Sequence, residues 1–159
     1  MEWPTGLGGK GNDGVAAMVK QTIGSIGYVE YAFALQNHMT HAQMQNKAGA
    51  FVQPTEANFG AAAAKADWAH APGYYLILVD QAGPTTWPIV GATFIIMHKS
   101  QANAAKGQQV LKFFDWAYRN GDAEAQQLDY IPLPAAVKTQ IRATWTAQIK
   151  GPNGAALYP

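Results

Sequence analysis

Two apolar runs of strand length, residues 74–79 and 89–98, constrain the fold of this chain more than any other feature. Turn residues bound both runs, with Pro72-Gly73 before the first and Gly83-Pro84 between them. Short runs rich in β-branched and aromatic residues predict strands, and the lack of polar alternation in the first run is typical of a strand buried on both faces. Helical patterns lie on either side of the two runs. This alternation of helix and strand predicts the α/β fold class.

The remaining patterns predict mostly helices. A first helix is expected to be capped by Asn12 or Asp13 and to end near Gln21, before Gly24. Two more strands and five more helices complete the prediction. The strands are expected at 25–31 and 50–52; the helices are expected at 32–43, 55–67 with Pro54 at the first helical position, 110–118 before Gly121, 123–128, and 133–149 between Pro134 and Gly151.

Composition excludes several function classes. Only 13% of the 159 residues are charged, against roughly 25% in a typical domain, and the net charge is +1 with no run of Lys or Arg. A nucleic-acid surface and a basic membrane-surface helix therefore have no electrostatic support. The chain has no cysteine, which excludes disulfides, zinc–cysteine sites and thiol catalysis. No apolar run approaches the roughly 20 residues of a membrane span.

The start of the sequence predicts a piece of a longer chain. Met1 is followed at once by Glu2, Trp3 and Pro4, so no basic patch and no apolar stretch of a signal peptide is present. The sequence then enters a glycine-rich loop with no strand before it, which is an unusual opening for an independent domain.

This loop is the first candidate site. The pattern Gly6-x-Gly8-x-x-Gly11 matches the dinucleotide fingerprint formally, but the required strand before it is missing. A loop that leads into a helix N-terminus presents free N–H groups and a positive dipole end. Gly9, Lys10, Gly11 and Asn12 are therefore anion-binding candidates. The alternative, and the more frequent use of such a loop, is tight packing against a neighbouring segment.

The other candidates for chemistry are weaker. His38 and His41 lie three residues apart, as on one helix face, but no third ligand stands nearby and two surface histidines explain them as well. No G-x-S-x-G elbow and no pair of carboxylates spaced for catalysis occurs. The residues thus favour neither a metal site nor an enzyme.

Several motifs resemble the phosphate-binding proteins of bacterial phosphate ABC transporters, the PstS family. They follow the family's order and cover almost the whole chain. These motifs are Trp3–Gly14, Ile26–Tyr31, Pro54–Phe59, Trp87–Ile89, Val110–Tyr118 and Leu128–Tyr130. The resemblance implies a type II periplasmic-binding-protein fold made of two α/β lobes that close on phosphate. It also implies that this chain is the C-terminal half only.

The resemblance assigns parts of the chain to the two lobes. Residues 1–86 are expected to be the later part of lobe II, 87–93 the crossover or hinge, and 94–159 the C-terminal part of lobe I. The family's phosphate ligands lie in segments before residue 1, so no phosphate ligand is assigned to any residue here. Both lobes would lack their opening strands, which predicts unpaired strand edges and exposed apolar faces.

The expected function is therefore substrate binding for phosphate transport, without catalysis and without a cofactor. The partners implied for the full-length parent are inorganic phosphate and the permease of a membrane ABC transporter, in the periplasm. One alternative is a fragment that self-associates or complements the missing N-terminal half without binding a ligand of its own. Another is an enzyme that binds a nucleotide or phosphoester through the glycine-rich loop.

Overall fold

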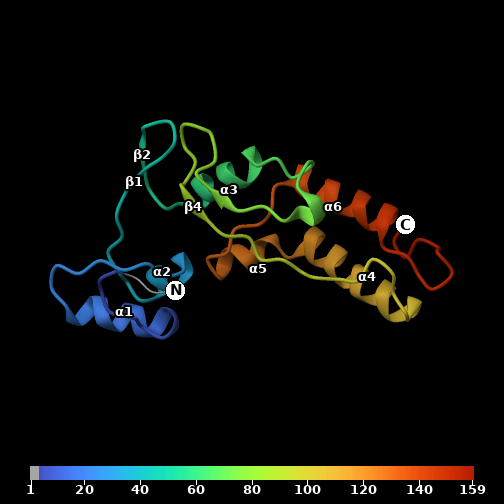
Figure 1. Ribbon diagram of the computed structural model, residues 1–159, viewed down its shortest axis with the longest axis horizontal. Coiled ribbons are helices and arrows are strands. Elements are labelled where there is room, and N and C mark those ends of the chain that lie inside the picture. The colour runs from blue at the N-terminus through green and yellow to red at the C-terminus, as the bar shows by residue number, and fades with distance from the viewer. Residues whose placement is uncertain (1–3) are drawn as a thin grey trace. The chain divides into compact units, whose positions relative to one another are not determined.

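The computed structural model describes residues 4–159 and divides the chain into two compact units, Met1–Ala42 and Gln43–Pro159. Trp3, where the first family motif begins, lies outside the described residues. Unit 1 holds two helices, α1 (Gly11–Gln21) and α2 (Tyr31–Gln36), drawn in blue in Figure 1. No helix in the described range is long and apolar enough to cross a membrane.

Unit 2 combines helices with short strands, which confirms the mixed helix-and-strand prediction. Its strands form two antiparallel pairs, β1 with β2 and β3 with β4. In chain order the elements are β1 (Met44–Gln45), β2 (Phe51–Val52), α3 (Glu56–Lys65), a 3-10 turn (Pro72–Tyr74), β3 (Leu78–Val79), β4 (Ile89–Val90), α4 (Ala104–Asn120), α5 (Asp122–Gln127) and α6 (Ala135–Gln148).

Two apolar clusters hold unit 2 together. The first joins Trp68 and Leu78 to Val137 of α6, so that the inner face of the β3–β4 pair packs on that helix. The second surrounds Leu111 of α4, which is fully buried, with Ile149 and Leu157 from the C-terminal segment. α4 and α6 lie against each other, as Figure 1 shows in gold and orange. The helix stripes predicted for the last third of the sequence are confirmed.

The helix starts differ from the predictions in two places. Lys10, not Asn12 or Asp13, is the N-cap residue of α1, and it makes no side-chain cap hydrogen bond. The Asn12 side chain binds Glu30 instead, so it is not free to cap the helix. At α3 the Thr55 side chain accepts the cap hydrogen bond, and Pro54 stands before the cap rather than at the first helical position.

The strand predictions are mostly wrong in extent. Residues 25–30 form no strand, Tyr31 begins α2, and that helix ends at Gln36 rather than at 43. The run 74–79 contributes two residues to β3 and the run 89–98 two residues to β4. A strand needs hydrogen-bond partners along its length, and in the described chain these runs find partners only where β3 meets β4.

The first run is also not buried on both faces. Leu78 is 2% exposed, whereas its neighbours Ile77 and Val79 are 64% and 50% exposed. The side chains alternate as on a sheet with one covered face. The predicted exposure of apolar faces is therefore present in the structure.

Candidate functional site

The glycine-rich loop leads into α1 as a tight bend. A Cβ on Gly9 would lie 2.5 Å from the backbone nitrogen of Val15, so the loop backbone packs directly on the first turn of the helix. Gly11 has φ +65°, a conformation that favours glycine. The loop thus needs glycine for its turn and for tight packing against a neighbouring segment, which is the alternative to anion binding.

Two of the four predicted anion-binding residues, Asn12 and Lys10, make hydrogen bonds within unit 1. The Asn12 Oδ1 atom accepts a hydrogen bond from the Glu30 backbone N–H at 3.1 Å, and its Nδ2 atom lies 3.5 Å from the Glu30 carboxylate. Lys10 is exposed at the helix N-terminus, and its carbonyl accepts from the Gly14 N–H. Anion binding by Gly9, Lys10, Gly11 and Asn12 stays a prediction.

The two histidines do not share a helix face. His38 lies beyond the end of α2 with φ +52°, and the His41 ring packs edge-on against Tyr31 at 6.1 Å. Within residues 4–159 no group of three metal-ligating side chains comes together.

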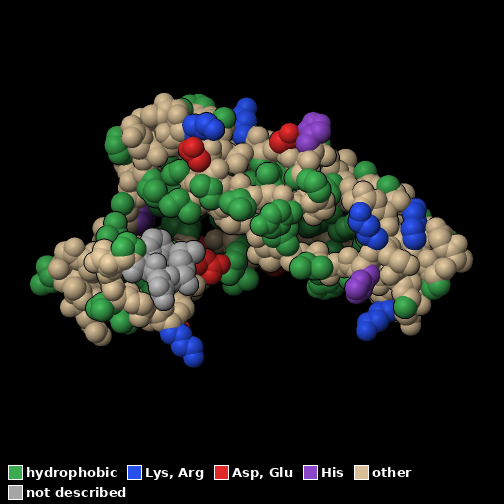
Figure 2. Space-filling model, in the orientation of Figure 1, with side chains coloured by type: hydrophobic (Ala, Val, Ile, Leu, Met, Phe, Trp, Pro, Cys, Tyr) green, Lys and Arg blue, Asp and Glu red, His purple; other side chains and the backbone are tan. Residues whose placement is uncertain are grey.

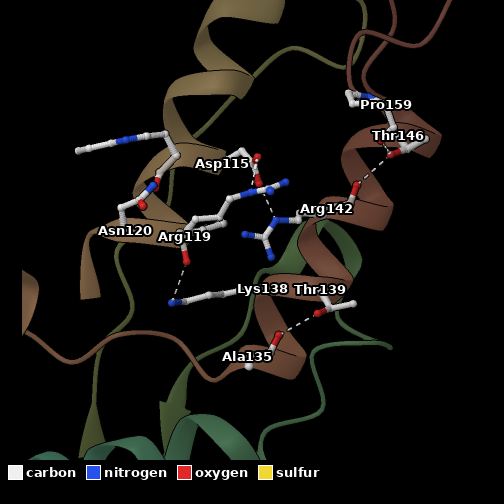
Figure 3. Close-up of polar contacts among 11 residues, drawn as sticks. Asp115, Arg119, Asn120, Ala135, Lys138, Thr139, Arg142, Thr146 and Pro159 are labelled. Carbon is white, nitrogen blue, oxygen red and sulfur yellow. Dashed lines mark hydrogen bonds and ion pairs between the residues drawn. The ribbon is translucent and has the colours of Figure 1, made fainter. Parts of the chain in front are cut away.

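A charged cluster between α4 and α6 is the most developed polar arrangement in unit 2 (Figure 3). Asp115 of α4 binds the Arg142 Nε atom at 2.6 Å and the Arg119 Nε atom at 2.9 Å. The Asp115 side chain is 15% exposed, so water screens these pairs only in part. One carboxylate thus joins two helices through a cation from each.

A second ion pair joins α6 to the start of α5. Lys138 of α6 is 6% exposed. Its Nζ atom lies 2.5 Å from the Oδ1 atom and 2.6 Å from the Oδ2 atom of Asp122, and 3.3 Å from the Tyr118 carbonyl oxygen. The Tyr118 ring stacks on Trp145 at 5.6 Å. The Lys138 Nζ atom lies 6.0 Å, and the Arg142 guanidinium 5.9 Å, from the centre of the Tyr118 ring. Burial of one ammonium is therefore compensated by a carboxylate, a carbonyl and an aromatic face.

The pKa shifts fit this arrangement. Burial acts to raise the pKa of Asp115, but hydrogen bonds from Arg142 and Tyr158 and the charge of Arg119 outweigh it, and the pKa lies below its ordinary value. Burial raises the pKa of Tyr118, which the charge of Arg142 opposes in part. Each of the three cations binds one of the two carboxylates, so the cluster is suited to holding the helices together.

Sequence reasoning missed this cluster. The pair of Asp115 with Arg119 has the i, i+4 spacing of a helix salt bridge and was detectable. Asp115 and Arg142 are 27 residues apart, and Lys138 and Asp122 are 16 apart. No local pattern links residues at those separations, because they meet only when α6 folds back against α4 and the start of α5.

Replacing Asp115 with Asn is expected to lower the free energy of unfolding by about 1–2 kcal/mol at pH 7, because both arginines lose their charged partner. The folded-state pKa of Asp115 is lowered, so its contribution is fully present above the unfolded value and is lost as the pH falls through the folded value. The difference between the two proteins should therefore shrink in acid. Urea unfolding at several pH values measures it.

Asp80→Asn is the matched control, because Asp80 is exposed and its φ of +53° is one that Asn also tolerates. This variant should change stability by less than about 0.5 kcal/mol. An Asp115→Asn effect of that size, or one that does not depend on pH, would contradict the proposed role of the ion pairs.

Polar side chains also line an open hollow at the start of α4. His98, Ser100, Gln101, Asn103 and Lys106 surround it. Asn103 caps the helix by accepting from the Lys106 N–H at 3.0 Å, and the Gln101 amide donates to the His98 carbonyl. These hydrogen bonds stabilise the start of α4, and this structural role accounts for the polar residues without a ligand.

Comparison with known proteins gives the chain's relatives. No family model matches it. It is 48% identical over 158 residues to the phosphate-binding protein PstS of Pasteurella multocida, and 46% identical over 150 residues to that of Haemophilus influenzae. It is also 31% identical over 153 residues to the PstS of the archaeon Methanocaldococcus jannaschii.

The matches cover most of this chain but less than half of each relative. They cover 99%, 94% and 86% of this chain but only 46%, 45% and 39% of the three relatives, respectively. The chain therefore spans less than half the length of the relatives it matches, which is consistent with the predicted correspondence to a C-terminal part. The resemblance seen in the motifs is confirmed: over nearly its whole length, this chain is homologous to part of the phosphate-binding proteins of the PstS family.

Proposed function

We propose that this chain is part of the substrate-binding component of an ABC transporter for inorganic phosphate. One observation carries the proposal: PstS relatives named as phosphate-binding proteins are 46–48% identical over 94–99% of the chain. Sequence identity at this level over nearly the whole chain indicates a shared fold. The role is recognition of the anion without a reaction.

The finer architecture belongs to the same proposal. The chain contributes residues 1–86 to lobe II, 87–93 to the hinge and 94–159 to lobe I of a type II periplasmic binding protein. Phosphate lies between the lobes, on ligands supplied by polypeptide outside this chain. The whole protein acts in the periplasm, where its closed form presents phosphate to the membrane permease.

A chimaeric protein tests the function. The matched part of the Pasteurella multocida PstS is replaced by this chain, and phosphate binding is measured by calorimetry for the chimaera and for the chain alone. We expect micromolar or tighter binding by the chimaera and none at micromolar phosphate by the chain alone, because the anion needs charge-assisted hydrogen bonds from the other segments.

Sulfate at the same concentration is the control ligand, since it has the shape of phosphate but carries no proton to donate at neutral pH. A folded chimaera that binds neither anion, or binds both equally, would contradict the proposed function. Micromolar phosphate binding by the chain alone would contradict the assignment of the ligands to other segments.

A further inference from the structure

The sequence contains two Asn-Gly pairs, Asn120-Gly121 and Asn153-Gly154. In such a pair the backbone nitrogen of glycine can attack the side-chain amide of asparagine, because glycine has no side chain to hinder the approach. The reaction needs the asparagine side chain to turn onto the following backbone nitrogen. Whether a pair reacts therefore depends on how the fold holds these two groups, and the fold holds the two pairs differently.

Asn120 is fixed at the end of α4. Its Nδ2 atom donates to the Trp116 carbonyl at 2.9 Å, and the Gly121 N–H donates to the Ala117 carbonyl at 2.8 Å. Both reacting groups are therefore engaged in hydrogen bonds to the last turn of the helix. α5 begins at the next residue, Asp122, so the pair is held between two helices. The reaction there requires the helix end to open first.

Asn153 lies at the tip of an exposed hairpin beyond the end of α6. Residues 149–151 and 155–157 form the arms of the hairpin, which backbone hydrogen bonds of 2.9 and 3.1 Å join. The three residues of the loop, 152–154, are all exposed. Figure 1 shows this loop in red beyond α6, and in the same place Figure 2 shows mainly tan atoms, which are backbone and uncharged polar side chains. Solvent therefore reaches the second Asn-Gly pair directly.

The side chain of Asn153 is already folded toward the glycine. Its Oδ1 atom accepts a hydrogen bond from the Ala155 N–H at 3.2 Å. The ring closed by this Asx turn contains the Gly154 nitrogen, so the side-chain amide is held near the attacking atom. Within residues 4–159 the Nδ2 atom of Asn153 donates no hydrogen bond, in contrast to that of Asn120. The Gly154 N–H donates to the Gly151 carbonyl across the exposed turn at 3.0 Å, and this bond is the restraint on the reaction.

We propose that Asn153 is a site of spontaneous deamidation, and that the isoaspartate product releases the C-terminal arm of the hairpin from unit 2. In the first step the Gly154 nitrogen loses its proton to water or a buffer base and forms a bond to the Cγ atom of Asn153. The bond from Cγ to Nδ2 breaks, and Nδ2 takes up a proton and leaves as ammonia. Water then opens the cyclic imide at one of its two carbonyls. Opening at Cγ gives aspartate, and opening at the backbone carbonyl gives isoaspartate.

The C-terminal arm, residues 155–159, is the part of the hairpin that packs on the core. Leu157 and Tyr158 are 7% and 8% exposed and belong to the second apolar cluster. The Thr146 hydroxyl of α6 donates to a backbone oxygen of Pro159 at 2.9 Å (Figure 3). The register of the hairpin sets where these side chains lie, and the loop length sets that register.

Isoaspartate changes the loop length. Its main chain runs through Cβ and Cγ, which adds one backbone atom to a three-residue loop. The two arms can then no longer pair in the same register, so Leu157 and Tyr158 withdraw from the apolar cluster. Aspartate leaves the main chain unchanged and keeps the side-chain oxygen that accepts from the Ala155 N–H. Only the isoaspartate product is therefore expected to release the arm.

Peptide mapping of the aged chain tests the site. The chain is incubated at mildly alkaline pH, folded or in guanidinium chloride, and the isoaspartate at each Asn-Gly pair is measured by enzymatic methylation. In the denaturant the two pairs should react at similar rates, because neither is held. In the folded chain Asn153 should react within about fivefold of its rate in the denaturant, whereas Asn120 should react at least about tenfold more slowly than it does there.

Two serine variants provide the matched controls. Asn153→Ser should abolish the reaction in the hairpin, because serine has no amide but its hydroxyl still accepts from the Ala155 N–H. Asn120→Ser should leave isoaspartate formation at Asn153 unchanged. Equal rates at the two pairs in the folded chain, or a faster reaction at Asn120, would overturn the assignment of the site.

Thermal unfolding of the separated products tests the release of the arm. The isoaspartate form should have a Tm more than about 5 °C below that of the unmodified chain, because two buried side chains lose their packing. The Asn153→Asp variant, which equals the aspartate product, should keep the Tm of the unmodified chain. An isoaspartate form with an unchanged Tm would overturn the release. Neither measurement depends on phosphate binding, so both stand apart from the proposed function.

Discussion

Replacing Asn46 with Asp is expected to lower the free energy of unfolding of unit 2 by about 3–5 kcal/mol at pH 7. Asn46 is 6% exposed, and its Nδ2 atom donates to three backbone carbonyls of the turn at residues 83–86 at 3.0–3.2 Å. Its Oδ1 atom accepts from the backbone N–H groups of Ala48 and Ala50. The side chain thus ties the β1–β2 turn to a loop almost 40 residues away.

The Asp variant has the same shape but no N–H donor. A carboxylate would face three carbonyl oxygens in a buried place, and all three would lose their partner. Burial beside these oxygens raises the pKa of the introduced carboxyl, so its protonated form is favoured in the folded state. The loss should therefore be largest at neutral pH and become smaller as the pH falls through the raised value.

Urea unfolding followed by tryptophan fluorescence measures this loss. Asn153→Asp is the matched control, because Asn153 is exposed and its side chain accepts one hydrogen bond from the Ala155 N–H, which a carboxylate also accepts. It should change stability by less than about 0.5 kcal/mol. Equal effects of the two variants would show that the Asn46 contacts do not anchor the turn.

Leu111→Ala is expected to cost about 3–4 kcal/mol. Leu111 is fully buried at the centre of the second apolar cluster, where Ile149 and Leu157 from the C-terminal segment and Trp145 of α6 surround it. Truncation of the side chain removes apolar contacts and leaves a cavity between α4 and α6. The helix itself should persist, because alanine favours helix more than leucine does.

The control for this prediction is Leu128→Ala, because Leu128 is 59% exposed and the same atoms are removed there. Its cost should stay below about 1 kcal/mol. Thermal unfolding of both variants by circular dichroism separates the two effects. A loss at Leu111 no larger than at Leu128 would mean that α4 is not held to the C-terminal segment through this cluster.

The helices were predictable from the sequence because their signals are local. The apolar stripe around Leu111 and Tyr118 and the break at Gly121 lie within one element, and α4 forms where they predict it, ending at Asn120. Helix hydrogen bonds join residues four apart, so a helix needs no distant partner. The motifs that resemble the PstS family are equally local, and the relatives confirm them.

The strands and the polar contacts depend on residues far away in the sequence. Residues 89–98 have the composition of a strand, yet only Ile89–Val90 pair, because a strand forms only beside another. Asn12 is a residue type that favours helix caps, but its side chain binds Glu30, 18 residues further along the chain. Asp115 meets Arg142 only across the α4–α6 contact. Local composition was therefore sufficient for the family relationship and for most helix positions, though not for the end of α2 at Gln36. Strand extent, cap choice and ion pairing were decided by packing, because each needs a partner that only the folded chain brings near.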